Sequence, residues 1–102
     1  MDRDVITLAL ANIDLPEEVN LETPEAIFRE RLTDYIKHLL DFEFGKLLQL
    51  LYRIDVAEDK VKTSLADSTD TRTDAEKISW LIIDRLEQKI NFRKQYASKN
   101  IP

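Results

Sequence analysis

The sequence contains no cysteine, one glycine and three prolines in 102 residues. The lack of cysteine excludes disulfides, thiolate metal ligands and a cysteine nucleophile, and it is typical of a reducing compartment. With one glycine there is no glycine-rich loop to hold a phosphate group. Few glycines and prolines also argue against a turn-rich β fold. We therefore expect a cytoplasmic, helical protein without a nucleotide site.

Targeting and catalytic signals are also missing. The apolar run at residues 5–11 follows Asp2 and Asp4, whereas a signal peptide has a basic start, and a membrane span needs about 20 apolar residues. We expect no leader and no membrane contact. His38 is the only histidine, and no Gly-x-Ser-x-Gly elbow accompanies it. We predict no enzyme activity, no catalytic residue and no cofactor.

The residues that are present favour one folded domain. Hydrophobic residues make up 43% and charged residues 34% of the chain, a balance that excludes a disordered protein. A chain of this length supports one hydrophobic core. We predict a single domain over residues 1–102.

Capping patterns mark the helix starts. Thr23 stands before a proline and a glutamate, which predicts a helix from Pro24 to about Leu40. Asp55 and Thr73 each lie three residues before a glutamate, the arrangement of a capping box. These boxes predict helices starting at Val56 and Asp74, and the last helix is predicted to reach Tyr96 or beyond.

Apolar side chains recur at helical spacing in these segments, which predicts an all-α bundle of four or five helices. The helix from Val56 carries few apolar residues and is predicted to be peripheral. The predicted core consists of Phe28, Leu32, Tyr35, Leu39, Phe44, Leu47, Leu48, Leu51, Ile78, Ile82, Leu86 and Ile90.

The segment 44–58 carries the widest apolar arc, interrupted only by a narrow strip of Lys46, Gln49 and Arg53. An arc this wide predicts a central helix that several neighbours cover. Its start is predicted near Asp41 or Phe42, unless the preceding helix continues with a kink at the single glycine.

The first 22 residues allow two interpretations. Val5, Ile6, Ala9, Leu10 and Ile13 fit a helical stripe, whereas residues 5–10 alone also fit a short strand. We favour a helix, and it would be able to pack on the last helix. The charges support such a contact, because residues 1–30 hold eight acids and residues 85–102 hold five bases and one acid.

The last helix also carries apolar residues away from its core stripe. The candidate interface residues are Trp80, Leu81, Gln88, Phe92 and Tyr96. Either the N-terminal segment covers this second face, or it meets a partner, since contiguous exposed aromatic residues mark interfaces. We predict a protein partner or self-association, most simply a homodimer.

The basic residues of the same helix suggest an alternative function. Arg85, Lys89, Arg93 and Lys94 lie among aromatic side chains, a composition compatible with nucleic-acid contact. Bases near a helix C-terminus also complement the helix dipole. The net charge of −5 argues against nucleic acid as the main partner.

One constellation has metal-ligand chemistry. Glu30, Asp34 and His38 recur every four residues and so share one helix face. That face lies opposite the apolar stripe, which favours a solvated acidic surface with an Asp34–His38 pair. We predict no metal site.

Two elements resemble a set of short, uncharacterised helical bacterial proteins. They are the stretch 50–56 with Lys60 and Val61, and the stretch 81–85. The resemblance covers roughly the C-terminal two thirds of the chain. It implies a helical fold and a bacterial cytoplasm, and it implies no activity, cofactor or catalytic residue.

Overall fold

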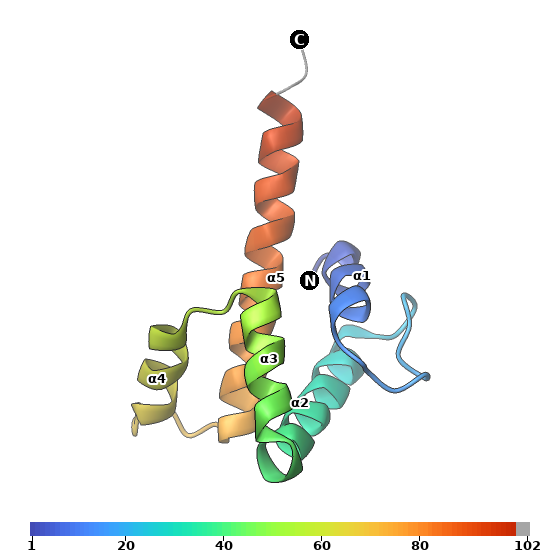
Figure 1. The fold of residues 1–102 in the computed structure, drawn as a ribbon. Coiled ribbons are helices and arrows are strands. Elements are labelled where there is room, and N and C mark those ends of the chain that lie inside the picture. The colour runs from blue at the N-terminus through green and yellow to red at the C-terminus, as the bar shows by residue number, and fades with distance from the viewer. Residues whose placement is uncertain (100–102) are drawn as a thin grey trace.

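The computed structural model describes the backbone of residues 1–99 and the side chains of residues 1–96, and this part of the chain forms five helices and no strand (Figure 1). The prediction of an all-α bundle is therefore confirmed. The helices are α1 (Arg3–Asn12), α2 (Glu25–Phe42), α3 (Phe44–Ile54), α4 (Glu58–Ala66) and α5 (Asp74–Lys99).

The central element is α5, which contacts each of the other four helices. The prediction that the segment 44–58 is central is wrong. Its wide apolar arc was the reason for that prediction, but α5 is more than twice as long as α3 and offers successive faces to several partners. The predicted core residues of α5, Ile78, Ile82, Leu86 and Ile90, are buried as expected, and Ala75 and Ile83 are buried beside them.

The most extensive packing joins α2 to α5. Four side chains at helical spacing on α2, Phe28, Leu32, Ile36 and Leu39, are completely buried. Burial of each such side chain contributes about 1.5–3 kcal/mol. Tyr35, also predicted in the core, is only half-buried.

The start of α2 differs by one residue from the prediction. Pro24 is the N-cap residue, and no side chain caps this helix. The Thr23 hydroxyl instead accepts a hydrogen bond from the backbone N–H of Asn20, at 2.8 Å. The Thr23 hydroxyl thereby closes the turn before the helix and does not cap the helix itself.

The chain passes from α2 to α3 through a single non-helical residue, Glu43, with φ −141° and ψ 57°. The alternative of a kink at Gly45 is wrong, because Gly45 lies inside the first turn of α3. Leu47, Leu50, Leu51 and Ile54 face the core, but Phe44 and Leu48 are 56% and 53% exposed. Their predicted place in the core is wrong, since α4 does not cover their side of α3.

The chain leaves α3 at Asp55, whose φ of 67° and ψ of 48° are left-handed. Aspartate adopts this conformation more readily than most residues. The N–H of Val56 donates to the Leu51 carbonyl at 3.0 Å, which satisfies one of the last carbonyls of α3. The predicted Asp55–Glu58 capping box is therefore wrong: Asp55 ends α3, and α4 begins at Glu58 rather than Val56.

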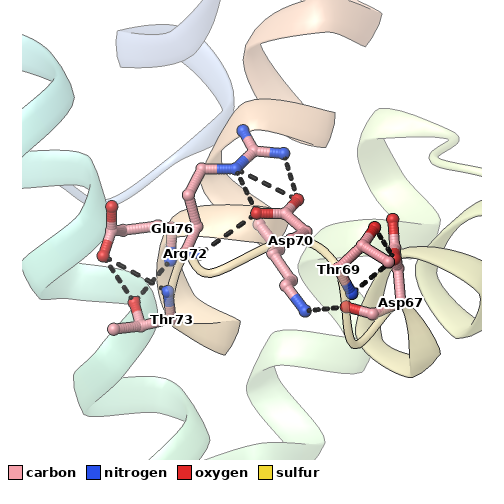
Figure 2. Close-up of polar contacts among 7 residues, drawn as sticks. Asp67, Thr69, Asp70, Arg72, Thr73 and Glu76 are labelled. Carbon is pink, nitrogen blue, oxygen red and sulfur yellow. Dashed lines mark hydrogen bonds and ion pairs between the residues drawn. The ribbon is translucent and has the colours of Figure 1, made fainter.

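The peripheral position of α4 is confirmed, because none of its residues is buried. The loop that follows leads to the predicted capping box of α5, which is present (Figure 2). The N–H of Glu76 donates to the Thr73 hydroxyl at 3.2 Å, and the Glu76 carboxylate accepts from the Thr73 N–H at 3.3 Å. Two otherwise unpaired amides are satisfied, so α5 begins at Asp74 as predicted.

The N-terminal segment is a helix rather than a strand. The Asp2 carboxylate caps α1 by accepting from the N–H of Asp4 at 2.9 Å. Val5, Ile6 and Ala9 are buried, and α1 packs against α5 and α3.

Candidate interaction surface on α5

The C-terminal part of α5 extends beyond the rest of the bundle (Figure 1). Ile90 is the last buried residue of α5 among those whose side chains are described, and every residue from Asn91 to Tyr96 is exposed. We call residues 91–96 the α5 tail. A helix of 26 residues spans about 39 Å, so α5 is longer than the core that its partners form.

Two aromatic rings lie on one side of the α5 tail. Phe92 is 68% exposed and Tyr96 is 62% exposed. Because they are four residues apart, they occupy the same helix face, and their rings stack with centroids 6.5 Å apart and planes inclined by 18°. They form an exposed apolar pair next to basic side chains.

The N-terminal segment packs on α5 without covering this pair. Asp4, Thr7, Leu8 and Ala11 of α1 line a depression with Ile90, Arg93 and Lys94 of α5. Asp2 also forms an ion pair with Lys94. Of the two alternatives for the second face of α5, cover by the chain's own N-terminus does not apply to Phe92 and Tyr96.

Leu81 and Gln88 lie closer to the body of the bundle. Leu81 is half-buried and lines a cavity of about 250 Å³ with Val56, Ala57 and Lys60 at the start of α4. Gln88 also lines this cavity, and it lines the shallow depression beside Phe92 as well. The five candidate interface residues are therefore not one patch: Gln88 connects Leu81 to the aromatic pair.

Trp80 lies apart from both. It is 48% exposed, but the Arg29 guanidinium of α2 lies 4.3 Å from the ring centroid and the Arg72 guanidinium lies 5.4 Å from it. These cation–π contacts fix the indole ring against Arg29 and Arg72 of the same chain. Trp80 serves to link the start of α5 to α2 and to the α4–α5 loop, so it does not belong to the aromatic surface of the α5 tail.

Arg72 is itself held by a bidentate contact with Asp70, at 2.6–3.2 Å (Figure 2). The hydrogen bonds from Arg72 lower the pKa of the Asp70 carboxyl from 3.8 to about 2. Nearby, the Asp67 carboxylate accepts from the N–H and the hydroxyl of Thr69, which lowers the pKa of Asp67. Side-chain hydrogen bonds of Asp67 and Asp70 therefore hold the loop between α4 and α5.

The four basic candidates for nucleic-acid contact divide into two kinds. Arg85 donates to the Asp55 carbonyl at 3.0 Å and to the Asp55 carboxylate at 3.1 Å. The hydrogen bond between Lys94 and Asp2 lowers the pKa of the Asp2 carboxyl and raises the pKa of the Lys94 ammonium. Lys89 and Arg93 lie beside Phe92 in a depression of about 550 Å³.

The acidic face of α2 is exposed, as its position opposite the apolar stripe predicts. Glu30 and Asp34 lie 3.6 Å and 4.0 Å from Arg31. The predicted Asp34–His38 pair is wrong: His38 Nε2 lies 3.3 Å from the Glu43 carboxylate, which the break after α2 brings within reach. Within residues 1–99, no three His, Asp or Glu side chains come together as a metal site.

A second exposed apolar surface was missed in the sequence. Phe44, Leu48 and Tyr52 recur every four residues along the side of α3 that the bundle does not cover, and Tyr52 is 89% exposed. The signal for it was the width of the apolar arc, which exceeds what one packed face requires. The same width predicts a central position for this helix, which α5 occupies instead.

Comparison of the chain with protein-family models, with curated proteins and with solved structures finds no match. The all-helical class is established by the fold, and the resemblance to bacterial helical proteins assigns no family. In the described part of the chain, no helix has the length and apolar character needed to cross a membrane.

Proposed function

We propose that this protein is a non-enzymatic interaction module that associates with a second copy of itself through the α5 tail. The observation that carries the proposal is the stacked pair of Phe92 and Tyr96, exposed on a helix end that extends beyond the bundle. Aromatic side chains are enriched at the centres of interfaces, where they bury a large area at a small entropic cost.

The electrostatics of the α5 tail are consistent with a protein surface as its partner. From Gln88 to Tyr96 the charged residues are Lys89, Arg93 and Lys94, all basic, whereas the whole chain has a net charge of −5. A second copy therefore supplies an excess of acidic groups. Opposite charges of this kind favour encounter and orientation more than they add affinity.

The proposal is tested by the mass of the protein in solution. We expect light scattering or sedimentation to give the mass of two chains at micromolar concentration, and the mass of one chain for the double variant Phe92→Ala/Tyr96→Ala. The matched control is Asn91→Ala, an exposed residue of the same tail on another side of the helix. A wild-type protein that stays monomeric as its concentration rises would refute self-association.

A nucleic-acid accessory role is the second candidate, favoured by the position of Phe92 between Lys89 and Arg93. An aromatic ring flanked by bases suits a stacked base and its phosphates. It predicts binding that weakens steeply with salt and is lost in Lys89→Ala/Arg93→Ala. Lack of binding to single-stranded oligonucleotides at low salt excludes it.

A further inference from the structure

The uncovered side of α3 forms one wall of a groove whose other wall is α4. Leu48, Leu51 and Tyr52 of α3 line it together with Val61 of α4, and the open hollow between them has a volume of about 210 Å³. Val56 and Glu58 close the end where the two helices are connected. We call this the α3–α4 groove. Glu58 is its only charged lining residue.

The α5 tail of the same chain does not reach this groove. α5 is one continuous helix through Lys99, and α3 and α4 lie beside its earlier part (Figure 1). The α5 tail points away from both. If the tail enters an α3–α4 groove, that groove belongs to another copy.

The dimensions of the two surfaces match. The tail from Phe92 to Tyr96 and the α3 wall of the groove from Leu48 to Tyr52 each rise by about 6 Å along their helix. Each surface has apolar side chains at i and i+4: Phe92 and Tyr96 on the tail, and Leu48 and Tyr52 in the groove. A helix with such anchors laid into an apolar groove is a recurring mode of recognition.

Their charges are also complementary. The charged residues flanking Phe92 are basic. Lys94 is paired with Asp2, so Lys89 and Arg93 are the bases that can contact an acidic group of a second copy. Glu58 at the groove pairs with Lys62 at 3.1 Å, and both side chains are more than 70% exposed. An ion pair this exposed is weak, so Glu58 is able to accept a new basic partner.

We propose that the α5 tail of one copy occupies the α3–α4 groove of a second copy, and that the exchange is reciprocal. The inference rests on the proposed self-association and names the surface that receives the tail. Phe92 and Tyr96 then contact Leu48 and Tyr52 of the second copy, and Arg93 approaches its Glu58. Two equal contacts of this kind form a closed two-fold dimer, with no free end for further growth.

The available area is sufficient for a stable dimer. If the exposed parts of Phe92, Tyr96, Leu48 and Tyr52 are completely buried, one tail-in-groove contact removes at most roughly 600 Å² of surface from water, the tyrosine hydroxyls included. The reciprocal pair reaches the lower end of the range of about 1,200–2,000 Å² that stable interfaces bury. A single contact falls below that range, so one contact alone is expected to hold two copies together more weakly than the reciprocal pair does.

The test uses one variant of each surface in the full-length chain. The groove variant is Leu48→Ser/Tyr52→Ser, and the tail variant is Phe92→Ala/Tyr96→Ala. All four residues are exposed within one copy, so both variants are expected to fold, which circular dichroism checks. The control for the groove is Gln49→Ala, an exposed residue on the polar side of α3. We expect each variant to raise the dimer dissociation constant tenfold or more, and the control to leave it unchanged.

Mixing the two variants is the decisive experiment. The tail variant retains an intact groove, and the groove variant retains an intact tail, so a mixture is able to form one of the two contacts. We expect sedimentation of the mixture to show a heterodimer that neither variant forms alone, weaker than the wild-type dimer. A charge exchange is the second measurement: Glu58→Arg weakens the dimer, and Glu58→Arg/Arg93→Glu restores it.

The outcomes separate this inference from the proposed function. If the tail variant is monomeric while the groove variant dimerises like the wild type, self-association through the tail stands and the groove assignment is wrong. If the groove variant is monomeric while the tail variant dimerises, two α3 faces pair with each other, and both proposals fail. The reciprocal contact is refuted if both variants and their mixture are all monomeric and the charge exchange does not restore the dimer.

Discussion

Leu47 and Leu48 are neighbours on α3, yet Leu47 is 1% exposed and Leu48 is 53% exposed. The side of α3 that carries Leu47 packs on α2, α5 and α1, whereas the side that carries Leu48 faces the α3–α4 groove. The same contrast separates α2, with four completely buried side chains, from α4, with none. One part of the molecule is held by completely buried side chains, whereas α4 contributes only partly buried ones, such as Val61, to the apolar packing.

Polar contacts at the two ends of α4 supplement the limited apolar packing of this helix. At its start, Arg85 donates to Asp55, and after its end, the Lys77 ammonium donates to the Asp67 carbonyl at 3.1 Å. The bidentate Asp70–Arg72 contact follows in the same loop. Such contacts fix where the chain runs, but exposed ion pairs add little stability. We therefore expect mutations on the α2 side to lower the free energy of unfolding more than mutations on the α4 side.

The largest difference is expected between Leu47→Ala and Leu48→Ala. The first leaves a cavity in the core and should lower the free energy of unfolding by about 2–5 kcal/mol. The second removes a half-exposed side chain and should cost less than about 1 kcal/mol. Urea unfolding at low protein concentration measures both without a contribution from self-association. Equal losses would mean that the α4 side is packed as firmly as the α2 side.

The next largest effect is expected at Asp55, where the chain turns from α3 to α4. Alanine is disfavoured in the left-handed conformation, so Asp55→Ala should cost about 1–2 kcal/mol. Asp55→Asn is the control, because asparagine tolerates this conformation and keeps an acceptor for Arg85. Thermal unfolding compares the two. A loss in Asp55→Asn as large as in Asp55→Ala would assign the effect to the charge rather than to the backbone.

A loss of about 1 kcal/mol is expected for Thr73→Ala, which removes the capping hydroxyl of α5. Thr71→Ala, in the exposed part of the same loop, should change the free energy of unfolding by less than about 0.5 kcal/mol. Chemical unfolding followed by circular dichroism measures both. Similar values for the two threonines would contradict the capping role.

The smallest effect concerns the pH dependence of the Asp70–Arg72 contact. The pKa of Asp70 is lowered from 3.8 to about 2, so its contribution to stability is complete above 3.8 and is lost as the pH falls towards 2. We expect the unfolding midpoint of the wild type to decrease more between pH 4 and pH 2 than that of Asp70→Asn. Trp80 fluorescence follows the transition, since Arg72 lies over its ring. Parallel curves would rule out a contribution from this pair, and Asp14→Asn controls for general loss of charge.

Much of the fold was predictable because it depends on local patterns. The stripes of α2 and α5 have the spacing of a single buried face, and both are buried as predicted except for the half-buried Tyr35. The Thr73–Glu76 capping box joins residues three apart, so it depends only on the helix starting at Asp74 and not on distant parts of the chain. Asp55 shows the limit of this approach: it has the same spacing to Glu58, but its side chain meets Arg85, thirty residues away.

The candidate surface was predictable only in part. Phe92 and Tyr96 were identified by their position off the core stripe of α5, and they are exposed. Trp80 shared that position, but Arg29 and Arg72 converge on it from two other elements. The exposed face of α3 was not predicted. The sequence places Phe44 and Leu48 in the core and Tyr52 in the apolar arc of the same helix, but a wide apolar arc does not say which parts of it other helices cover.

The sequence alone determined the helical class, the start of α5 and the buried faces of α2 and α5, since each follows from spacing within a few turns of one helix. The tertiary structure alone decided that α5 rather than α3 is central, that α4 stands off from α3, and that two apolar surfaces are left uncovered. Those outcomes depend on how long the helices are and where the connections place them. No local pattern encodes that information, because side-chain periodicity is a property of one helix, whereas packing depends on the relative position of two helices.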